Sequence, residues 1–426
     1  MIWGVQVSSH ASVKADFWSG RELVQWTKAG QKRWRARIEG TALVTEAISG
    51  SRKPRESRKK LGSKAAAREE LDRAVRKKML EGYAYFRGRA GAAHGDRLFA
   101  MRPPGGFGSS TFDVDPEGRF VFVGAGRGDP KAWVVRVDLG AERLDQISVA
   151  PDRPGGQLFI HAAAIDADGR TGYYALNART RELDFATGKE RVAAGFGGSS
   201  ASHFNAFCVK PGTDAAHRRM LVLCPKDVLE VREIPAGRTL CAVSLRSPTA
   251  ECRSAALSPS GRLLAAYMAS RYLVYQHEDA RRDKTNEVRV FNVDDGSLIA
   301  RVPMPEQVDE VGVTPDDGAV VVLLDSNRGP CAFEVEDGKL RFAVRGEESS
   351  YGHCSAWAFS PDGSTLAVGD HTREVRLLDA RSLAPRGVLS TGTGFSGVER
   401  LAFTAGGTEL FVGGGGLIEA FAIDLT

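Results

Sequence analysis

The chain has 426 residues, which corresponds to about two or three domains of ordinary size. Hydrophobic residues make up 42% and charged residues 26%, a balance that excludes a chain disordered throughout. No apolar stretch approaches the roughly 18 residues that a membrane-spanning helix requires. Six single cysteines without a CxxC pair, and an N-terminus without a signal-peptide pattern, lead us to expect a cytoplasmic protein with no membrane contact.

Charge divides the chain into two parts. Residues 1–95 carry 21 Lys and Arg against 9 Asp and Glu, a net charge of +12, whereas residues 96–426 carry 37 against 44, a net charge of −7. The change falls near a stretch rich in glycine and alanine, so we expect a linker at 85–96. Two charge regimes predict two modules with different partners.

Within residues 97–426, a turn motif recurs between short apolar runs that alternate in the manner of strands. Proline early in the motif and glycine at its end suit a tight hairpin connection. The turn glycines are 51, 43, 49, 57, 45 and 44 residues apart. The seven turns are Asp115–Gly118, Asp166–Gly169, Lys210–Gly212, Ser258–Gly261, Thr314–Gly318, Ser360–Gly363 and Thr404–Gly407.

A repeat of this length built from short strands predicts a mainly β fold, a seven-bladed β-propeller. The clearest repeat contains Gly352-His353, the turn at Ser360–Gly363, Asp370 and the pair Leu378-Asp379. It resembles the WD-repeat pattern, with leucine in place of the signature tryptophan. The resemblance implies a WD-repeat-like propeller over residues 97–426 and implies little about activity, because propellers host many functions.

The ends of the repeat region predict how the ring closes. The last repeat has room for three strands before the chain stops, so its fourth strand must come from elsewhere. Residues 97–101 lie just before the first complete repeat, and we expect them to form the outer strand of the last blade. An unclosed ring would leave strand edges exposed.

One repeat is about ten residues longer than the others, because residues 271–285 are inserted before the strand that begins near Glu287. Long insertions in repeat proteins map to loops, often on a binding face. A longer, solvated hairpin explains the insertion equally well. Its candidate partner-binding residues are Tyr275, His277, Arg281 and Arg282.

The N-terminal part contains a predicted hairpin at 33–44, a basic stretch and a predicted helix. Ser63 suits the helix N-cap, apolar residues from Ala67 to Met79 follow helical spacing, and Gly82 is a natural stop. We interpret the basic stretch as a loop that contacts nucleic-acid phosphates without sequence preference. Its six candidate residues are Arg52, Lys53, Arg55, Arg58, Lys59 and Lys60.

This order of elements resembles a WGR domain, a small antiparallel sheet with a loop and a packed helix. The match spans about residues 21–84, and residues 1–20 are an extension of unassigned structure. Where the family has Trp-Gly-Arg, this chain has Ile48-Ser49-Gly50. In poly(ADP-ribose) polymerases that neighbourhood helps hold a DNA end, so the departure speaks against recognition of DNA ends here.

The sequence indicates neither catalysis nor a cofactor. The eight histidines are scattered without the spacing of a metal site, and GxSxG, HExxH and phosphate-binding loop motifs are absent. We therefore expect an adaptor whose propeller binds protein partners and whose basic domain contacts DNA or RNA. The alternatives are a scaffold that binds proteins alone and, less favoured, a propeller enzyme of the lactonase type.

Overall fold

The structure of the chain is a computed structural model. It describes residues 17–424 apart from 28–29, 51–52, 104–109, 116, 126, 130–131, 150–157, 166–168, 177–178, 198–218, 225–227, 234–237, 246, 248–249, 271–285, 325–328, 338, 347–353, 371–372 and 393–396. Across these residues, no helix combines the length and the apolarity needed to cross a membrane.

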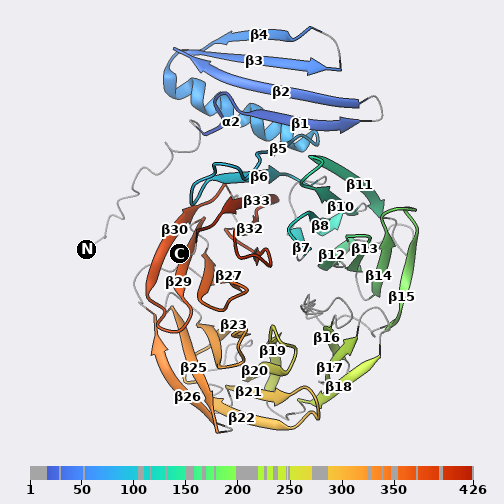
Figure 1. Cartoon of the computed structure of the whole chain (residues 1–426), viewed down its shortest axis with the longest axis vertical. Coiled ribbons are helices and arrows are strands. Elements are labelled where there is room, and N and C mark those ends of the chain that lie inside the picture. Colours follow the sequence, from blue (N-terminus) through green and yellow to red (C-terminus); the bar gives the residue numbers. More distant parts are fainter. Residues whose placement is uncertain are drawn as a thin grey trace.

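The fold is mainly β and propeller-like, as the turn repeat predicts: antiparallel sheets follow one another around a ring (Figure 1). The described residues form seven sheets. The first sheet of the ring contains β7 (Ser110–Val114), β8 (Phe120–Ala125), β10 (Ala132–Asp138) and β11 (Arg143–Val149). The second contains β9 (Arg127–Asp129), β12 (Leu158–Ile165), β13 (Thr171–Leu176), β14 (Arg179–Asp184) and β15 (Glu190–Gly197). The third contains β16 (Arg219–Cys224), β17 (Val228–Glu233) and β18 (Thr239–Ser244).

Three four-stranded sheets follow, each with its strands in chain order. Their side chains pack between neighbouring sheets, which gives the ring a series of apolar clusters in place of one central core. They contain β19 (Ala250–Leu257), β20 (Leu263–Ser270), β21 (Glu287–Asn292) and β22 (Leu298–Pro303); β23 (Val308–Val313), β24 (Ala319–Leu324), β25 (Pro330–Glu336) and β26 (Lys339–Arg345); and β27 (Cys354–Phe359), β28 (Thr365–Asp370), β29 (Glu374–Asp379) and β30 (Pro385–Ser390).

The turns at Ser258–Gly261, Thr314–Gly318, Ser360–Gly363 and Thr404–Gly407 connect the first two strands of their sheets, whereas Lys210–Gly212 lies outside the described residues. In the turn at Ser360–Gly363, the Gly363 amide donates to the Ser360 carbonyl at 2.9 Å and Gly363 has a φ of 73°. The turn at Thr314–Gly318 is one residue longer, and there Asp317 donates to Thr314 and has the positive φ of 60°. The distance along the chain from the first turn residue therefore sets the left-handed position, even where glycine is not the residue that occupies it.

The last sheet of the ring combines both ends of the repeat region. It contains β31 (Arg400–Phe403), β32 (Glu409–Gly414) and β33 (Leu417–Ala422), followed by β6 (Arg97–Met101). β6 pairs antiparallel with β33, so that Phe99 lies opposite Ala420 and Met101 opposite Ile418. Residues 97–101 thus lie at the outer side of the last ring sheet, next to its third strand.

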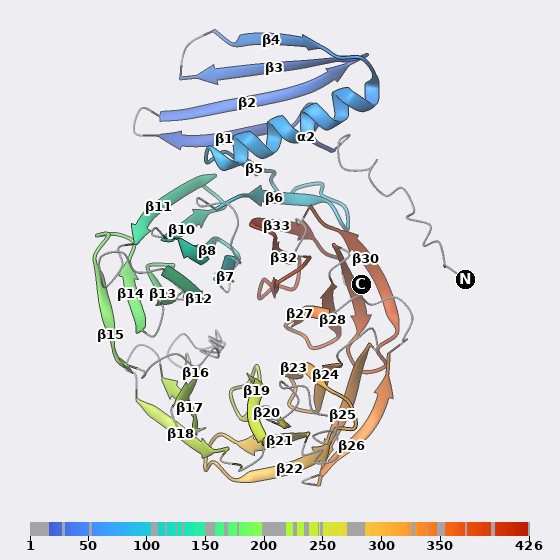
Figure 2. The same ribbon diagram turned by 180° about the vertical axis from the view of Figure 1, so that it is seen from behind.

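The N-terminal unit, residues 17–86, is a sheet with one helix packed on it (Figure 2). Its strands are β1 (Glu22–Thr27), β2 (Gly30–Glu39), β3 (Ala42–Ser49) and β4 (Arg55–Lys60), and α2 spans Lys64–Leu80. The Ser63 hydroxyl accepts from the Ala66 amide, which confirms the expected N-cap. The apolar stripe of α2 packs on Trp34, Ala36 and Leu43 of the sheet.

The segment expected to be a linker is folded. β5 (Ala84–Phe86) pairs with β1 on one side and with β6 on the other, so the N-terminal sheet and the last ring sheet form one nine-stranded sheet. Gly95 donates to the Ala422 carbonyl at 2.8 Å, and Arg87 pairs with Asp96 at 2.9 Å. Composition indicates flexibility here, but backbone pairing of this short segment with two distant strands overrides it.

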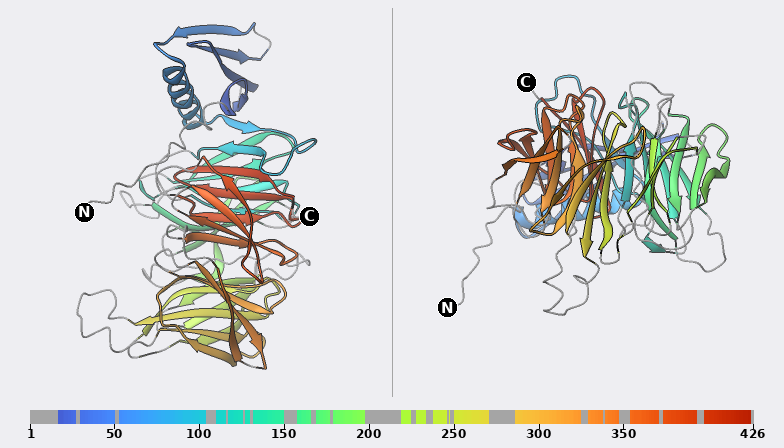
Figure 3. Two further views of the ribbon diagram at one scale, coloured as in Figure 1. Left: turned by 90° about the vertical axis from the view of Figure 1, so that its left-hand side faces the viewer. Right: turned by 90° about the horizontal axis from the view of Figure 1, so that it is seen from below.

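Two further contacts hold the N-terminal unit at the rim of the ring (Figure 3). Ala100 and Leu417 of the last ring sheet belong to the same apolar cluster as the core of α2. The Trp26 indole Nε1 donates to the carbonyl of Glu142, in the turn before β11, at 2.5 Å. The unit is therefore attached to two neighbouring sheets of the ring.

Candidate interface for an anionic partner

The basic stretch lies on a strand and not on the expected loop. Arg55, Arg58, Lys59 and Lys60 belong to β4, whose six residues are all exposed and pair antiparallel with β3. β4 is the terminal strand of the nine-stranded sheet and lies farthest from the ring (Figure 1). A polar strand without apolar alternation is tolerated there because a terminal strand buries little surface. Lys53 precedes β4 and is exposed, whereas Arg52 lies outside the described residues.

On the sheet face away from α2, arginines and glutamates compensate one another. Arg37 pairs with Glu39, Glu46 and Glu56, and these carboxylates raise the pKa of its guanidinium above the ordinary value. Arg58 pairs with Glu39 at 2.7 Å, and hydrogen bonds from Arg37 and Arg58 lower the pKa of that carboxyl. Arg33 and Arg35 both lie 3.3 Å from Glu22. This face is a network of ion pairs with little net charge.

The face that carries α2 is more basic. Glu70 of α2 accepts from Lys59 at 2.7 Å and from Arg73 at 2.6 Å, and the hydrogen bond from Lys59 lowers the pKa of the Glu70 carboxyl. Strand alternation places Arg55 on the same face as Lys59. One carboxylate thus lies among three cations along the border between α2 and β4.

Among the described residues, three of the six predicted cations have no ion pair: Lys53, Arg55 and Lys60. The sequence identifies the cations but not the glutamates that pair with two of the five described ones, Arg58 and Lys59. The signal was present, because Glu39 continues the alternation of Arg33, Arg35 and Arg37 along one strand. The surface left to attract an anionic partner is therefore the outer border of β4.

The predicted partner-binding residues of the insertion, Tyr275, His277, Arg281 and Arg282, lie outside the described residues. In the part of the chain that the structure describes, no three His, Cys, Asp or Glu side chains gather as metal ligands would.

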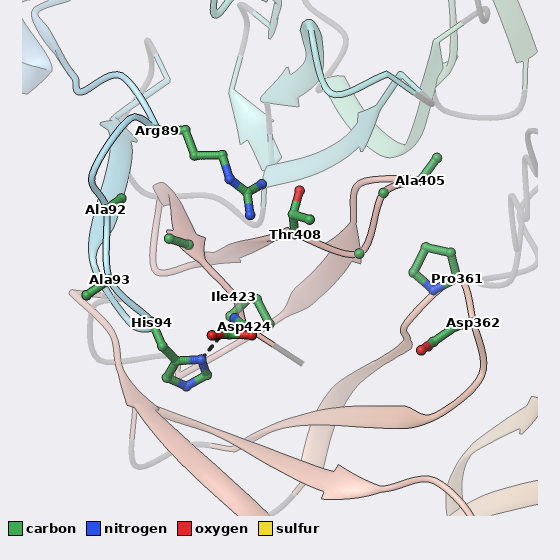
Figure 4. A pocket seen from close by; sticks show the side chains of 13 residues that line it. Arg89, Ala92, Ala93, His94, Pro361, Asp362, Ala405, Thr408, Ile423 and Asp424 are labelled. Carbon is green, nitrogen blue, oxygen red and sulfur yellow. Dashed lines mark hydrogen bonds between the residues drawn. The ribbon is translucent and has the colours of Figure 1, made fainter. Parts of the chain in front are cut away.

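A cavity of about 460 Å³ lies where the segment 87–96 crosses the last two ring sheets (Figure 4). Ala405, Gly406 and Gly407 of the turn at Thr404–Gly407 form part of its wall. Arg89 points into the cavity and lies 3.7 Å from Glu409, and His94 Nδ1 accepts from the Asp424 amide at 3.1 Å. Asp362 also lines the cavity, so acidic groups outnumber its single arginine and no anion is favoured there.

A partly buried carboxyl lies between two neighbouring ring sheets. Ser254 of β19 donates from Oγ to Glu310 Oε2 of β23 at 2.9 Å, and the same Oγ accepts from the Val311 amide at 3.1 Å. Burial, with a smaller contribution from Asp309, raises the pKa of Glu310 to about 7, while Ser254 and Arg400 oppose the rise. These two hydrogen bonds of the Ser254 hydroxyl tie the two sheets together.

Replacing Glu310 with Gln should remove a pH dependence of stability. The folded-state pKa of Glu310, about 7, lies above its ordinary value, so the folded protein keeps this proton to higher pH than the unfolded chain. The wild-type free energy of unfolding therefore falls by about 1–3 kcal/mol as pH rises from the ordinary pKa of 4.5 through the folded-state pKa of about 7. Urea unfolding at pH 5 and pH 8 should show a smaller difference in Glu310→Gln. The exposed Glu334→Gln is the matched control, and parallel behaviour of the two variants would contradict the assignment.

Comparison with known proteins adds the fold alone. No family model matches the sequence, and no curated protein matches it. Among solved structures, the chain resembles one from Kuenenia stuttgartiensis hydrazine synthase, with a TM-score of 0.56 and 16% identity over 80% of this chain and 100% of that one. At this identity the likeness supports a propeller-like fold and carries no activity to this chain.

Proposed function

We propose that this protein is a non-catalytic interaction scaffold, in which a seven-bladed WD-repeat-like propeller carries a WGR-like unit that docks an acidic protein segment. In this proposal the seven sheets are the seven blades, and β6 closes the last one. The propeller offers a second surface for protein partners. The unit is attached at two points of the rim, so both partners are held at a fixed separation.

The observation that carries the proposal is the position of the basic residues on a terminal strand. Among the described residues, no strand pairs with the outer edge of β4, and the same strand carries exposed cations. A protein segment can use both features, because its backbone pairs with strand edges and its carboxylates pair with lysine and arginine. Nucleic-acid phosphates can pair with the cations and accept from outward N–H groups, but they cannot donate to the outward C=O groups of a strand edge.

Nucleic-acid backbone is the second candidate, and the cations along the border between α2 and β4 favour it. Arg55, Lys59 and Arg73 lie on one face with a single carboxylate, Glu70, among them. The three cations without ion pairs, Lys53, Arg55 and Lys60, correspond to a slope of log affinity against log salt of about −3 on duplex DNA. Contacts of this kind are independent of sequence.

Charge reversal at the three cations without ion pairs tests the proposal. The triple variant Lys53→Glu, Arg55→Glu, Lys60→Glu should weaken binding of an acidic peptide about tenfold or more, since each exposed pair contributes about 0.2–1 kcal/mol and reversal adds repulsion. Binding is measured by fluorescence anisotropy with a peptide of alternating glutamate and valine, duplex DNA, single-stranded DNA and RNA.

The matched control reverses three exposed ring cations that have no ion pair among the described residues: Lys189, Arg301 and Lys339. It changes the net charge equally and should bind the acidic peptide as the wild type does. Preference of the wild type for nucleic acid over the peptide would support the second candidate. Absence of binding to every probe at low salt would contradict both.

A further inference from the structure

We infer that the acidic partner binds as an added strand along the free edge of β4, through main-chain hydrogen bonds to Glu56, Arg58 and Lys60. This inference rests on the proposed docking function and specifies its geometry. It distinguishes strand addition from attraction by charge alone.

The hydrogen bonds between β3 and β4 show which backbone N–H and C=O groups of β4 face away from the sheet. Leu61 donates to the Thr41 carbonyl of the chain before β3 at 3.0 Å, so residues 61, 59, 57 and 55 direct their backbone groups toward β3. The residues between them direct theirs away. The hydrogen bonds between β2 and β3 agree with this assignment. Gly50 donates to the Gln31 carbonyl, so the even-numbered residues of β3 direct their backbone groups toward β2 and the odd-numbered ones toward β4. The N–H and C=O groups of Glu56, Arg58 and Lys60 therefore line the free edge.

The side chains of β4 select which strand can be added. Five of the six residues are polar or charged without being acidic, and Glu56 is the exception. A second copy of β4 would place cations opposite cations, which is unfavourable in a cross-strand pair. An acidic segment would instead place carboxylates beside Arg55 and Lys59 on one face or beside Arg58 and Lys60 on the other. The charges that discourage self-association thus favour an acidic strand.

The edge is also ordered before binding. β4 pairs with β3 over six consecutive residue pairs, and the hydrogen bond from Lys59 to Glu70 fixes it to α2. The sheet continues without interruption into the ring through β5 and β6. Only the incoming segment loses conformational freedom on binding, which makes a short peptide sufficient.

Two substitutions at Glu56 separate strand addition from charge. Glu56→Pro removes a negative charge together with an outward N–H, and proline is tolerated at a free strand edge because the lost N–H pairs with no other strand. Glu56→Gln neutralises the same residue and keeps the N–H. Strand addition predicts that Glu56→Pro binds the acidic peptide about five- to tenfold more weakly than Glu56→Gln, which itself binds at least as tightly as the wild type.

The same test is made on the peptide, which requires no change in the protein. Two versions of the acidic peptide carry N-methyl groups on alternate backbone nitrogens. One version is methylated at the odd-numbered residues and the other at the even-numbered residues. An added strand directs one set of its N–H groups to β4 and the other to solvent, so one version should lose binding about tenfold and the other should not. Thermal unfolding of Glu56→Pro verifies that the protein is folded.

The outcomes separate the inference from the proposed function. If Glu56→Pro and Glu56→Gln bind the acidic peptide equally and both methylated peptides keep binding, the docking function stands and strand addition is wrong. If wild type binds duplex DNA or RNA but no peptide, the partner is nucleic acid and both the acidic-segment proposal and strand addition are wrong. If nothing binds, the docking function itself fails.

Discussion

Replacing Arg97 with Met should lower the free energy of unfolding by about 3–5 kcal/mol, because it leaves a buried carboxylate without its partner. Glu419 of β33 is fully buried, and its Oε1 lies 2.7 Å from Arg97 Nε. Its second oxygen, Oε2, accepts from the Gly392 amide at 2.5 Å. The Arg97 guanidinium also lies 4.3 Å from the ring centroid of Phe17. The substitution therefore removes a contact to the last sheet of the propeller-like ring, through Glu419, and a contact to the N-terminal unit, through Phe17.

Urea unfolding of two further variants checks the cause. The double variant Arg97→Met, Glu419→Gln should recover a large part of the loss, since no buried charge is left uncompensated. Arg87→Met breaks the more exposed pair with Asp96 in the adjacent segment and should cost about 1 kcal/mol or less. Equal destabilisation by Arg97→Met and Arg87→Met would show that Glu419 does not depend on Arg97.

Deleting residues 1–105 should abolish cooperative unfolding, whereas deleting residues 1–95 should leave a folded ring. The longer deletion removes β6 and its pairing with β33. It also removes the buried side chains of Leu98, Phe99 and Met101, a loss of about 5–8 kcal/mol. A loss of this size is comparable with the whole stability of a typical domain. The shorter deletion keeps β6 and loses the N-terminal unit together with the contacts of residues 87–95, such as those of Gly95 with Ala422 and of Arg89 with Glu409.

Circular dichroism and calorimetry of the two truncated chains give the answer. The chain that starts at residue 96 should show one thermal transition, at a lower temperature than the full chain because Ala100 and Leu417 lose their packing against the α2 core. The chain that starts at residue 106 should show none. Closely similar transitions in both would mean that β6 does not close the last ring sheet.

Local signals in the sequence predicted the elements that depend on local interactions. Ser63 marked the helix N-cap, and the turn at Ser360–Gly363 marked a hairpin, because each is formed by residues within a few positions of one another. The turn at Thr314–Gly318 shows the limit of such signals. There the left-handed residue is Asp317, since the hydrogen bond back to Thr314 and not the glycine sets the position.

The elements that the sequence did not reveal depend on distant partners. β4 contains only polar and charged residues, so no apolar alternation distinguishes it from a loop, and its pairing with β3 makes it a strand. β5 has three residues within a stretch that composition marks as a linker, and its pairing with β1 and β6 orders it. The compensation of Arg37 by Glu46 and Glu56 likewise arises only after three strands are side by side.

Residue-resolved hydrogen exchange of β4, with and without the acidic peptide, tests the docking account most directly. In the free protein the amides of Glu56, Arg58 and Lys60 should exchange faster than those of Arg55, Ser57 and Lys59, whose backbone groups face β3. Saturating peptide should slow the exchange of the three outward amides about tenfold or more and leave the inward three nearly unchanged. Unchanged exchange at Glu56, Arg58 and Lys60 in the peptide complex would contradict the account.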